Sequence, residues 1–240
     1  MEVYKFAQMF VEIDGEHEFD LTRVVLRGPN GDFYYAETKD RVFTSSDIDI
    51  DSLEKISIDT DKCWPRYSAR LLRAPSPVPP DSYVKEAEFI HYNKNSILRN
   101  LAAHEIEAFE LLRQHPHPNI VEYRGCVVSD GRISGICLAK LEMSLYKRMQ
   151  DSTPFDKGLF FEGIERGIRH LHSLGIVHND INPKTIMLDK LDRPVIICLD
   201  IWRSINGSKY DYALFENDIF GLSKILEFIY DPSSGEPLDE

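Results

Sequence analysis

The sequence lacks the features that mark several protein classes. Its cysteines, Cys63, Cys126, Cys137 and Cys198, show no CxxC spacing, so neither a zinc site nor a disulfide framework is indicated. No apolar run approaches the roughly 18–20 residues that a membrane-spanning helix needs. The N-terminal stretch MEVYKFAQMFVEID has no basic segment and no continuous apolar segment, which makes it a poor signal peptide. We therefore expect reduced thiols in an intracellular, cytoplasmic protein without a membrane partner.

Positive charge is also scarce. Lys and Arg together number 28 against 40 Asp and Glu, which gives a net charge of −12. Because neutralising nucleic-acid phosphates requires clustered Lys and Arg, we expect no nucleic-acid partner. An acidic surface instead favours a basic protein partner. The length of 240 residues and a hydrophobic content of 42% suffice for one sizeable domain or two small ones.

Residues 1–75 are predicted to form a β-rich region. The stretch VVLRGPNGDFYYAE contains two strand-like runs around the turn Pro29–Asp32, which is typical of a β-hairpin. In the stretch DIDIDSLEKISID, Ile alternates with Asp as it would in a half-buried strand. The same run begins like a calcium loop, but Ser52 stands where that loop needs Gly and Ile58 where it needs Glu. We therefore interpret it as a strand.

A cluster of prolines separates this region from the rest of the chain. The stretch LLRAPSPVPPDSY contains four prolines, which fix φ and remove hydrogen-bond donors, so it is predicted to be extended. We place the boundary near Ala74, between regions 1–75 and 76–240. The acidic first region has few large apolar residues, so we expect it to pack with the second in one compact body.

Two charged residues beyond this boundary are predicted to face inward. The stretch SYVKEAEFI reads as a strand with Lys85 on its more apolar face. The stretch SILRNLAAHEIEAFELLRQ reads as a helix in which Glu105 falls within the apolar stripe formed by Leu101, Ala108 and Leu112. A Lys85–Glu105 pair would satisfy both charges. The alternative is a lysine that reaches solvent from a strand edge.

Further strands and helices complete the predicted order. The stretches IVEYRGCVV and ISGICLAKL read as two strands joined by a turn. A long helix is expected to begin with Thr153 as N-cap and Pro154 as its first residue, and to end before Gly175. After a strand in PVIICLDIW, the stretch ENDIFGLSKILEFIYD is apolar around much of a helix, as a central buried helix would be.

This order, together with three motifs, resembles the eukaryotic protein-kinase family over about residues 76–230. VHNDINPKTIMLD resembles the catalytic loop HRDLKPENIML, and HPHPNIVEYRGC resembles the segment after the αC helix. ENDIFGLSKIL resembles the αF helix, with Asp218 at the position that anchors the loop. Phrases such as RGIRHLHSLGIVHNDINP are similar to small fungal kinase-like proteins. The resemblance implies an α+β, two-lobed fold: a β-rich N-lobe to about residue 141 and a truncated helical C-lobe ending near the αF-like helix.

The resemblance also implies roles for individual residues. Lys85 takes the position of the lysine that holds ATP phosphates, and Glu105 that of its αC partner. Leu138 resembles the gatekeeper, and the backbone from Ala139 to Leu141 resembles the hinge that binds adenine. Asp180 takes the catalytic-base position, which orients the substrate hydroxyl.

Departures from the family pattern concentrate at the charge-handling positions. Asn182 replaces the lysine that neutralises the transferring phosphate, and Thr185 replaces the asparagine that binds the second magnesium ion. Cys198 stands at the metal-binding Asp of the DFG motif, although Mg²⁺ prefers hard oxygen ligands. Asp200, two residues further on, is the alternative metal ligand. No GxGxxG run precedes Lys85 and no APE motif follows.

These departures favour a pseudokinase that serves as a binding or scaffold module for an unknown, basic protein partner. Weak ATP binding is expected, and magnesium binding is doubtful. The alternative is a divergent ATP-dependent Ser/Thr-type kinase that uses Asp180 as base and Asp200 as metal ligand. A third reading is a stable but inactive remnant. In either of the inactive cases, Asp180 persists only because it caps loop amides.

Overall fold

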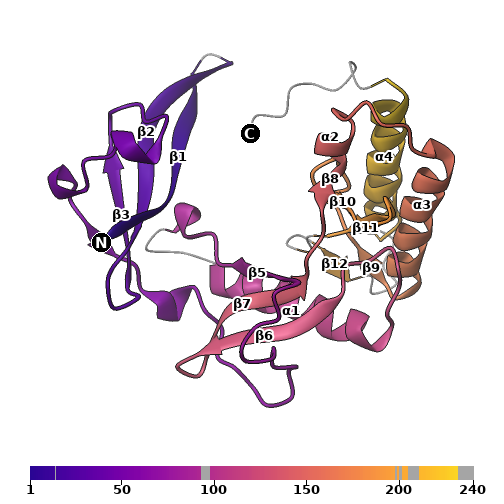
Figure 1. Cartoon of the computed structure of the whole chain (residues 1–240), viewed down its shortest axis with the longest axis horizontal. Coiled ribbons are helices and arrows are strands. Elements are labelled where there is room, and N and C mark those ends of the chain that lie inside the picture. Colours follow the sequence, from indigo (N-terminus) through magenta and orange to yellow (C-terminus); the bar gives the residue numbers. More distant parts are fainter. Residues whose placement is uncertain (14, 93–97, 198, 200–201, 205–210, 232–240) are drawn as a thin grey trace. The chain divides into compact units, whose positions relative to one another are not determined.

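The computed structural model describes residues 1–13, 15–92, 98–197, 199, 202–204 and 211–231, and it forms two compact units (Figure 1). Unit 1 comprises Met1–Pro65 and Glu86–Ala102, and unit 2 comprises Arg66–Lys85 and Ala103–Glu240. The division falls earlier than the boundary near Ala74 that the prolines predict. It also differs from the expectation of one compact body, because each unit has a core of its own.

Unit 1 is built on a four-stranded antiparallel sheet in the order β1-β2-β3-β4. The strands are β1 (Glu2–Ile13), β2 (Glu16–Arg27), β3 (Phe33–Thr38) and β4 (Ile56–Ser57). The predicted hairpin is confirmed: the Gly28 amide donates to the Asp32 carbonyl at 2.7 Å in the turn between β2 and β3. The core of the unit is rich in aromatic side chains and contains Val25, Phe33, Ile58, Cys63, Phe89, Ile90 and Tyr92.

Most of the aspartate-rich segment is not the strand that its alternation predicts, since only Ile56–Ser57 form a strand, β4. It forms the short 3-10 helices η1 (Ser45–Asp47) and η2 (Ile50–Ser52), and η3 (Thr60–Lys62) follows β4. The carboxylate of Asp47 accepts the Thr44 amide at 2.8 Å at the start of η1. Aspartate side chains compete in this way with a strand's hydrogen-bond ladder, and this explains why the period-two pattern is wrong here.

The sheet of unit 2 has the strand order β5-β7-β6. These strands are β5 (Ser82–Glu86), β6 (Tyr123–Ser129) and β7 (Arg132–Ala139), and helix α1 (Leu98–Gln114) precedes β6. The strand β5 is shorter than predicted. It stops at Glu86 because the next residues turn into η4 (Phe89–His91) and place Phe89 in the core of unit 1.

The first part of the proline-rich linker belongs to unit 2 because it pairs with β6. The Cys126 amide donates to the Leu72 carbonyl at 2.7 Å, and the Ala74 amide donates to the Cys126 carbonyl at 2.9 Å. The Leu72 amide donates to Glu110 Oε1 at 2.7 Å. Gly125 has φ +115°, and a Cβ there would lie 2.6 Å from the Ala74 nitrogen, so only glycine permits this approach.

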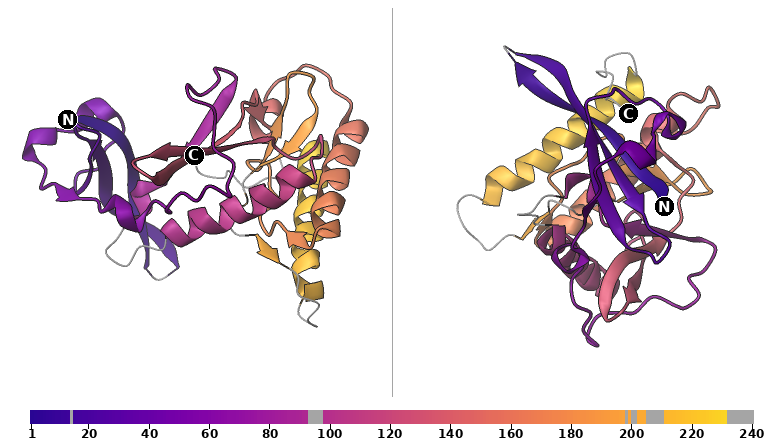
Figure 2. Two further views of the ribbon diagram at one scale, coloured as in Figure 1. Left: turned by 90° about the horizontal axis from the view of Figure 1, so that it is seen from below. Right: turned by 90° about the vertical axis from the view of Figure 1, so that its left-hand side faces the viewer.

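The helical part of unit 2 consists of α2 (Leu145–Arg148), α3 (Lys157–Ser173) and α4 (Asp211–Tyr230). Figure 2 shows α3 and α4 lying side by side. The intervening short strands are β8 (Met143–Ser144), β9 (Ile176–Val177), β10 (Ile186–Leu188), β11 (Pro194–Ile196) and β12 (Arg203–Ser204). None of the described helices is both long enough and apolar enough to span a membrane.

Helix α3 begins later than predicted. Its N-cap is Asp156, whose side chain accepts the Leu159 amide at 2.9 Å, whereas Thr153 and Pro154 lie before the helix. Its end agrees with the prediction, because Gly175 follows with φ 72°. Its buried face includes Phe160, Ile164, Ile168 and Leu171.

Helix α4 is longer than predicted and is not buried all round. It begins at Asp211 rather than near Glu216. One face is buried in the core of unit 2 and includes Asp218, Leu222, Ile225 and Ile229. On the other face, Ile219 and Phe220 are 55% and 65% exposed.

Candidate functional site

The predicted pair of inward charges is present in unit 2. Lys85 Nζ on β5 lies 2.8 Å from Glu105 Oε1 on α1. The Glu105 side chain is 5% exposed and that of Lys85 is 20% exposed, so the lysine does not reach into solvent from the strand edge. Glu105 Oε1 also accepts the Leu199 amide at 3.3 Å, which ties α1 to the segment after β11. The pair is therefore confirmed as a geometric feature, while a role in holding phosphate stays a prediction.

The predicted adenine-binding stretch follows β7 directly. Leu138, the gatekeeper candidate, is buried, and Leu141 is half-buried. Three amides of this stretch, those of Ala139, Lys140 and Glu142, donate to carbonyls of the protein. Among the described residues, no protein acceptor is bonded to the Leu141 amide. The stretch thus keeps one backbone donor with which a ligand could pair.

A buried carboxylate on α4 holds the predicted catalytic loop. Asp218 is fully buried, and its two oxygens accept the His178 amide at 2.9 Å and the Asn179 amide at 2.7 Å. This confirms the anchoring position predicted for Asp218. His172 Nε2 on α3 lies 2.8 Å from the same carboxylate. The sequence did not reveal this third contact, because nothing in either helix pattern pairs one with the other.

His178 shapes the loop. It is fully buried, its Nδ1 accepts the Asp180 amide at 3.2 Å, and its Nε2 lies 2.8 Å from the Ile197 carbonyl. With Nδ1 accepting, Nε2 carries the proton and donates to that carbonyl. Both ring nitrogens are engaged, so the imidazole is a structural group here.

The loop residues that depart from the family pattern bond to one another. The Asn182 side-chain amide donates to Asp180 Oδ1 at 2.7 Å. The Thr185 hydroxyl donates to the Asp180 carbonyl at 2.6 Å and accepts the Asn182 amide at 3.0 Å. Thr185 is 6% exposed, whereas Asp180 is exposed. Asn182 thus occupies one oxygen of Asp180, the candidate base, and the Thr185 hydroxyl is hydrogen-bonded to the loop backbone.

The donors of this loop do not fit a bound magnesium ion. Mg²⁺ demands near-octahedral oxygen coordination, and the hydroxyl of Thr185 is buried and already bonded. Within the described part of the chain, no group of three or more His, Cys, Asp or Glu could hold a metal ion. The two remaining candidates, Cys198 and Asp200, lie outside the described residues.

The sheet around Lys85 also offers no described cradle for phosphates. In the order β5-β7-β6, the strand that carries Lys85 is an edge strand. No other strand of the described ranges pairs with its outer edge. In protein kinases a glycine-rich loop covers the phosphates with backbone amides. Here the residues before Lys85 are the proline-rich linker.

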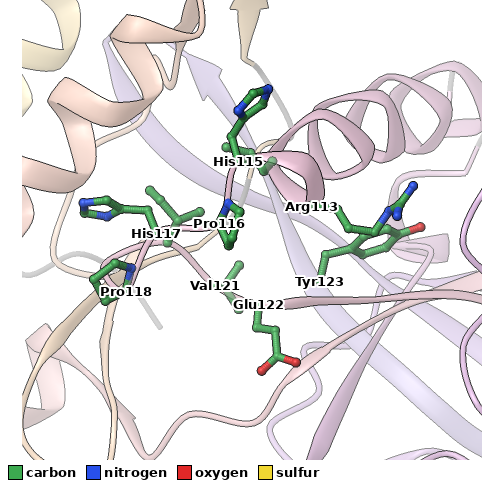
Figure 3. Close-up of a pocket in the computed structure, with 10 residues that line it drawn as sticks. Arg113, His115, Pro116, His117, Pro118, Val121, Glu122 and Tyr123 are labelled. Carbon is green, nitrogen blue, oxygen red and sulfur yellow. The ribbon is translucent and has the colours of Figure 1, made fainter.

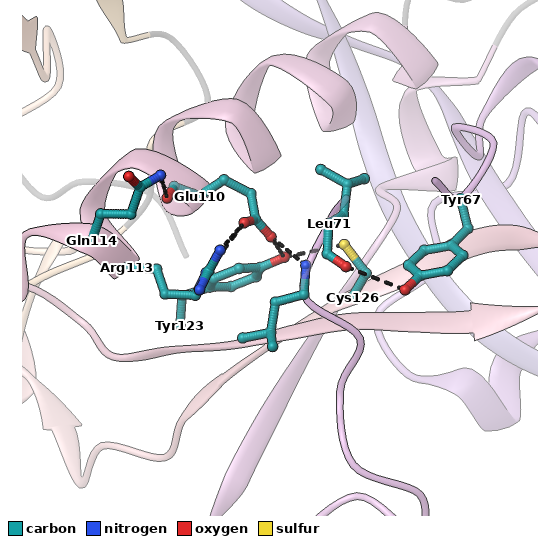
Figure 4. Close-up of polar contacts among 8 residues, drawn as sticks. Tyr67, Leu71, Glu110, Arg113, Gln114, Tyr123 and Cys126 are labelled. Atoms are coloured by element: carbon teal, nitrogen blue, oxygen red, sulfur yellow. Dashed lines mark hydrogen bonds and ion pairs between the residues drawn. The ribbon is translucent and has the colours of Figure 1, made fainter. Parts of the chain in front are cut away.

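A polar network behind the sheet is structural rather than reactive. The Tyr123 hydroxyl lies 3.1 Å from both Glu110 Oε1 and Cys126 Sγ (Figure 4). Burial raises the pKa of the Tyr123 hydroxyl and of the Cys126 thiol, so both stay protonated. In unit 1, burial raises the pKa of the Cys63 thiol to about 12. Protonated, buried thiols are not nucleophiles.

A pocket of about 440 Å³ lies at the end of α1, away from the candidate site (Figure 3). Its lining comes from the end of α1, the loop that follows and the start of β6, and includes Leu112, His115, His117 and Tyr123. His117 stacks on His170 of α3 with ring centroids 4.7 Å apart. The lining contains neither Lys85 nor any residue of the catalytic-loop motif, so the pocket is distinct from the kinase-like site.

Known proteins resemble part of this chain. The family model described as "Protein kinase domain" matches residues 84–210, which is more than half of the chain. The chain is 32% identical over 101 residues to Wee1-like protein kinase 1-A of Xenopus laevis, covering 39% of this chain and 17% of that protein. It is 30% identical over 95 residues to a Serine/threonine-protein kinase US3 homolog of Equine herpesvirus 1 (strain Ab4p), covering 38% and 24%. These alignments span less than a quarter of either relative.

Proposed function

This chain belongs to the protein kinase domain family, and from that premise we propose that it acts as a pseudokinase that binds a protein partner. The observation that supports the proposal most strongly is the hydrogen bonding within the catalytic-loop motif. Asn182 occupies one oxygen of Asp180, and the Thr185 hydroxyl is buried in bonds to the loop backbone. The positions that should handle phosphate and metal charge serve the loop's own structure instead.

The chemistry of phosphoryl transfer makes these changes severe. Transfer relies on positioning and on electrostatic stabilisation by metal ions and cations. Loss of one such stabilising group typically costs about 3–4 kcal/mol of transition-state stabilisation. Asn182, Thr185 and Cys198 replace three such groups together. An Asp180 that orients a hydroxyl contributes little when the phosphate is not held in place.

Weak, magnesium-independent binding of ATP is part of the proposal. The Lys85 ammonium, held by Glu105, is a cation that could meet a phosphate. The Leu141 amide is a donor that could meet an adenine ring. Neither contact needs a metal ion, but without a backbone cradle over the phosphates the affinity should be low.

The second candidate function is a divergent Ser/Thr-type phosphotransferase with Asp180 as base and Asp200 as metal ligand. The observation in its favour is the preserved loop geometry. Asp180 is exposed, and the backbone just before it is anchored by the buried Asp218. A loop that had lost all function would not need this carboxylate at its surface, although its hydrogen bond from the Asn182 side-chain amide is also a sufficient reason.

Thermal unfolding of the full chain with ATP, with and without Mg²⁺, distinguishes these functions. We expect a small rise in Tm with ATP that does not need Mg²⁺, is lost in Lys85→Ala, and is kept in Lys224→Ala. Lys224 is the matched control because it is an exposed lysine of α4. A Mg²⁺-dependent rise together with phosphate transfer that Asp180→Ala abolishes would overturn the pseudokinase proposal. No shift with either ligand would favour a scaffold or an inactive remnant without nucleotide.

A gain-of-function variant tests whether the changes at the phosphate-handling and metal-handling positions cause the inactivity. The triple substitution Asn182→Lys, Thr185→Asn and Cys198→Asp restores the family residues at the three changed positions. If their loss explains inactivity, the variant should gain Mg²⁺-dependent stabilisation by ATP. If the natural chain already shows the same Mg²⁺-dependent shift, these positions are not the cause.

A further inference from the structure

The far end of the β1-β2 hairpin is a two-stranded ribbon that the rest of the sheet does not support. β1 pairs with β2 as far as Ile13 and Glu16, but β3 pairs with β2 only over residues 22–27. The hairpin ribbon is defined here as residues 10–13 of β1 and 16–19 of β2. Figure 1 shows this part of the hairpin extending past β3. Isolated two-stranded ribbons are marginally stable in water, so a third strand would stabilise it.

The outer edge of β1 is open. β1 is the first strand in the order β1-β2-β3-β4, and no other strand of the described ranges pairs with it. An edge strand presents a row of backbone donors and acceptors that another chain can use. Natural sheets usually protect such edges by shortness, proline, lysine or β-bulges. β1 is 12 residues long, has no proline, and has no lysine beyond Lys5. Its register shifts lie between Val3 and Lys5 and between Met9 and Phe10, so none falls within residues 10–13.

Apolar side chains surround this edge on both faces of the ribbon. Val11 and Ile13 lie on one face and are 41% and 47% exposed. Phe10 lies on the other face and is 47% exposed, with its ring centroid 6.2 Å from that of Phe19. The Arg41 guanidinium covers both rings only in part, at 5.7 and 5.5 Å from their centroids. Apolar side chains on both faces would give an added strand contacts beyond its backbone hydrogen bonds.

The charge of the ribbon selects the kind of strand that can bind. The stretch FVEIDGEHEFD, residues 10–20, has five acidic residues and no Lys or Arg. Glu12, Glu16 and Glu18 are exposed. A second copy of this chain would place the same acidic stretch against itself, and like charges across strands are destabilising. A basic strand would instead find opposite charges beside the open edge.

We propose that the β1 edge of the hairpin ribbon binds an extended basic peptide segment of a partner protein, which adds a strand to the sheet. Backbone hydrogen bonds would supply affinity, and the side chains would supply specificity. Cationic side chains would lie on the Glu12 face and apolar side chains beside Val11 and Ile13. This site lies outside residues 84–210, so it stands whether or not the kinase-like site binds nucleotide.

The test uses the full chain and a fluorescent peptide of alternating Lys and Val, with binding followed by anisotropy. We expect binding that weakens at least tenfold in the double variant Val11→Lys, Ile13→Lys, and that weakens with added salt. The corresponding Glu-Val peptide should not bind. Leu191→Lys is the control, because Leu191 is 71% exposed in unit 2, and this variant should bind like the natural chain.

Backbone methylation separates strand addition from simple charge attraction. In a bound edge strand, only alternate residues direct their N–H groups to the neighbouring strand. We therefore expect that N-methylation of either all Val or all Lys residues abolishes binding, while the other pattern is tolerated. Tolerance of both patterns, or unchanged binding in the double variant, would overturn the proposal. So would failure of every peptide to bind, or dimerisation of the chain that the double variant abolishes.

Discussion

The pairing of Lys85 and Glu105 gives a prediction for single residues. Glu105 is 5% exposed and holds both the Lys85 ammonium and the Leu199 amide. Breaking a buried pair leaves an uncompensated charge, so Glu105→Ala should lower the unfolding free energy by roughly 3 kcal/mol. Lys85→Met should have a comparable effect, and the double variant less than the sum. Urea unfolding measures the unfolding free energy of all three variants. Single variants whose unfolding free energy lies within about 0.5 kcal/mol of that of the natural chain would contradict the prediction.

A second prediction concerns pH and the stacked pair His117 and His170. Burial, followed by the charges of His170 and Arg166, lowers the pKa of His117 below its usual value. The unfolded chain therefore binds more protons at this histidine than the folded chain as pH falls below about 6.5. This contribution favours the folded state above that pH and is lost as pH falls.

The measurement is the urea midpoint between about pH 7 and pH 5. His117→Gln should flatten the loss of stability with falling pH, because the group that resists protonation is gone. His17→Gln, at an exposed histidine of β2, is the control for the loss of one histidine. Equal slopes for the natural chain and His117→Gln would show that this histidine titrates normally.

Some site residues could be predicted from the sequence and others could not, for physical reasons. Lys85 and Glu105 interrupt apolar faces, and a charge on such a face must find a partner nearby. Asp218 lies within a motif that resembles the αF helix. His172 gave no such signal, because its partner Asp218 lies 46 residues further along the chain, on another helix. The use of Asn182 to cover Asp180 depends on loop geometry that no spacing rule supplies.

At the scale of elements, the presence of the helices was predicted better than the residues at which they begin. The buried stripe of α3 follows from its 3.6-residue period, which does not depend on neighbours. Its N-cap did not follow, because Thr153 and Asp156 are both good caps and the helical period does not distinguish between them. The aspartate-rich segment failed for a related reason. Alternation indicated a strand, but aspartates that bond to nearby amides favour short 3-10 turns.

Glycines in α3 give a prediction at this scale. A Cβ on Gly163 would lie 2.6 Å from Pro194 Cγ, so Gly163→Ala should push α3 away from β11. We expect a loss of about 1–3 kcal/mol from this overpacking, even though Ala is the better helix former. Gly158→Ala is the matched control, because the nearest atom to its Cβ is Asp156 Oδ1 at 3.4 Å. It should stabilise the chain by about 0.5–1 kcal/mol in the same urea experiment. Equal effects of the two substitutions would contradict the packing of α3 on β11.

At the scale of the whole chain, the sequence predicted an irregular segment at the prolines but not the unit to which that segment belongs. Prolines predict extended backbone, and they do so wherever that backbone packs. The bonds of Leu72 and Ala74 with Cys126 assign the first part of the linker to unit 2. The sequence also did not predict that residues 86–102 belong to unit 1. That assignment depends on contacts between Phe89 and aromatic residues that are distant in the chain.

Because each unit has its own core, we expect a core substitution to destabilise the unit that contains it and not the other unit. Phe89 is 2% exposed, and its ring centroid lies 4.5 Å from that of Phe33 in unit 1. Phe89→Ala should remove about 3–5 kcal/mol from that core and speed amide exchange in β2 and β3, but not in α3. Ile164→Ala, at a fully buried position of unit 2, should do the reverse and speed exchange in α3 and β11. Hydrogen exchange followed by mass spectrometry reads both outcomes in one experiment. If each substitution instead speeds exchange throughout the chain, the two cores unfold as one cooperative unit and the division at Pro65 has no energetic meaning.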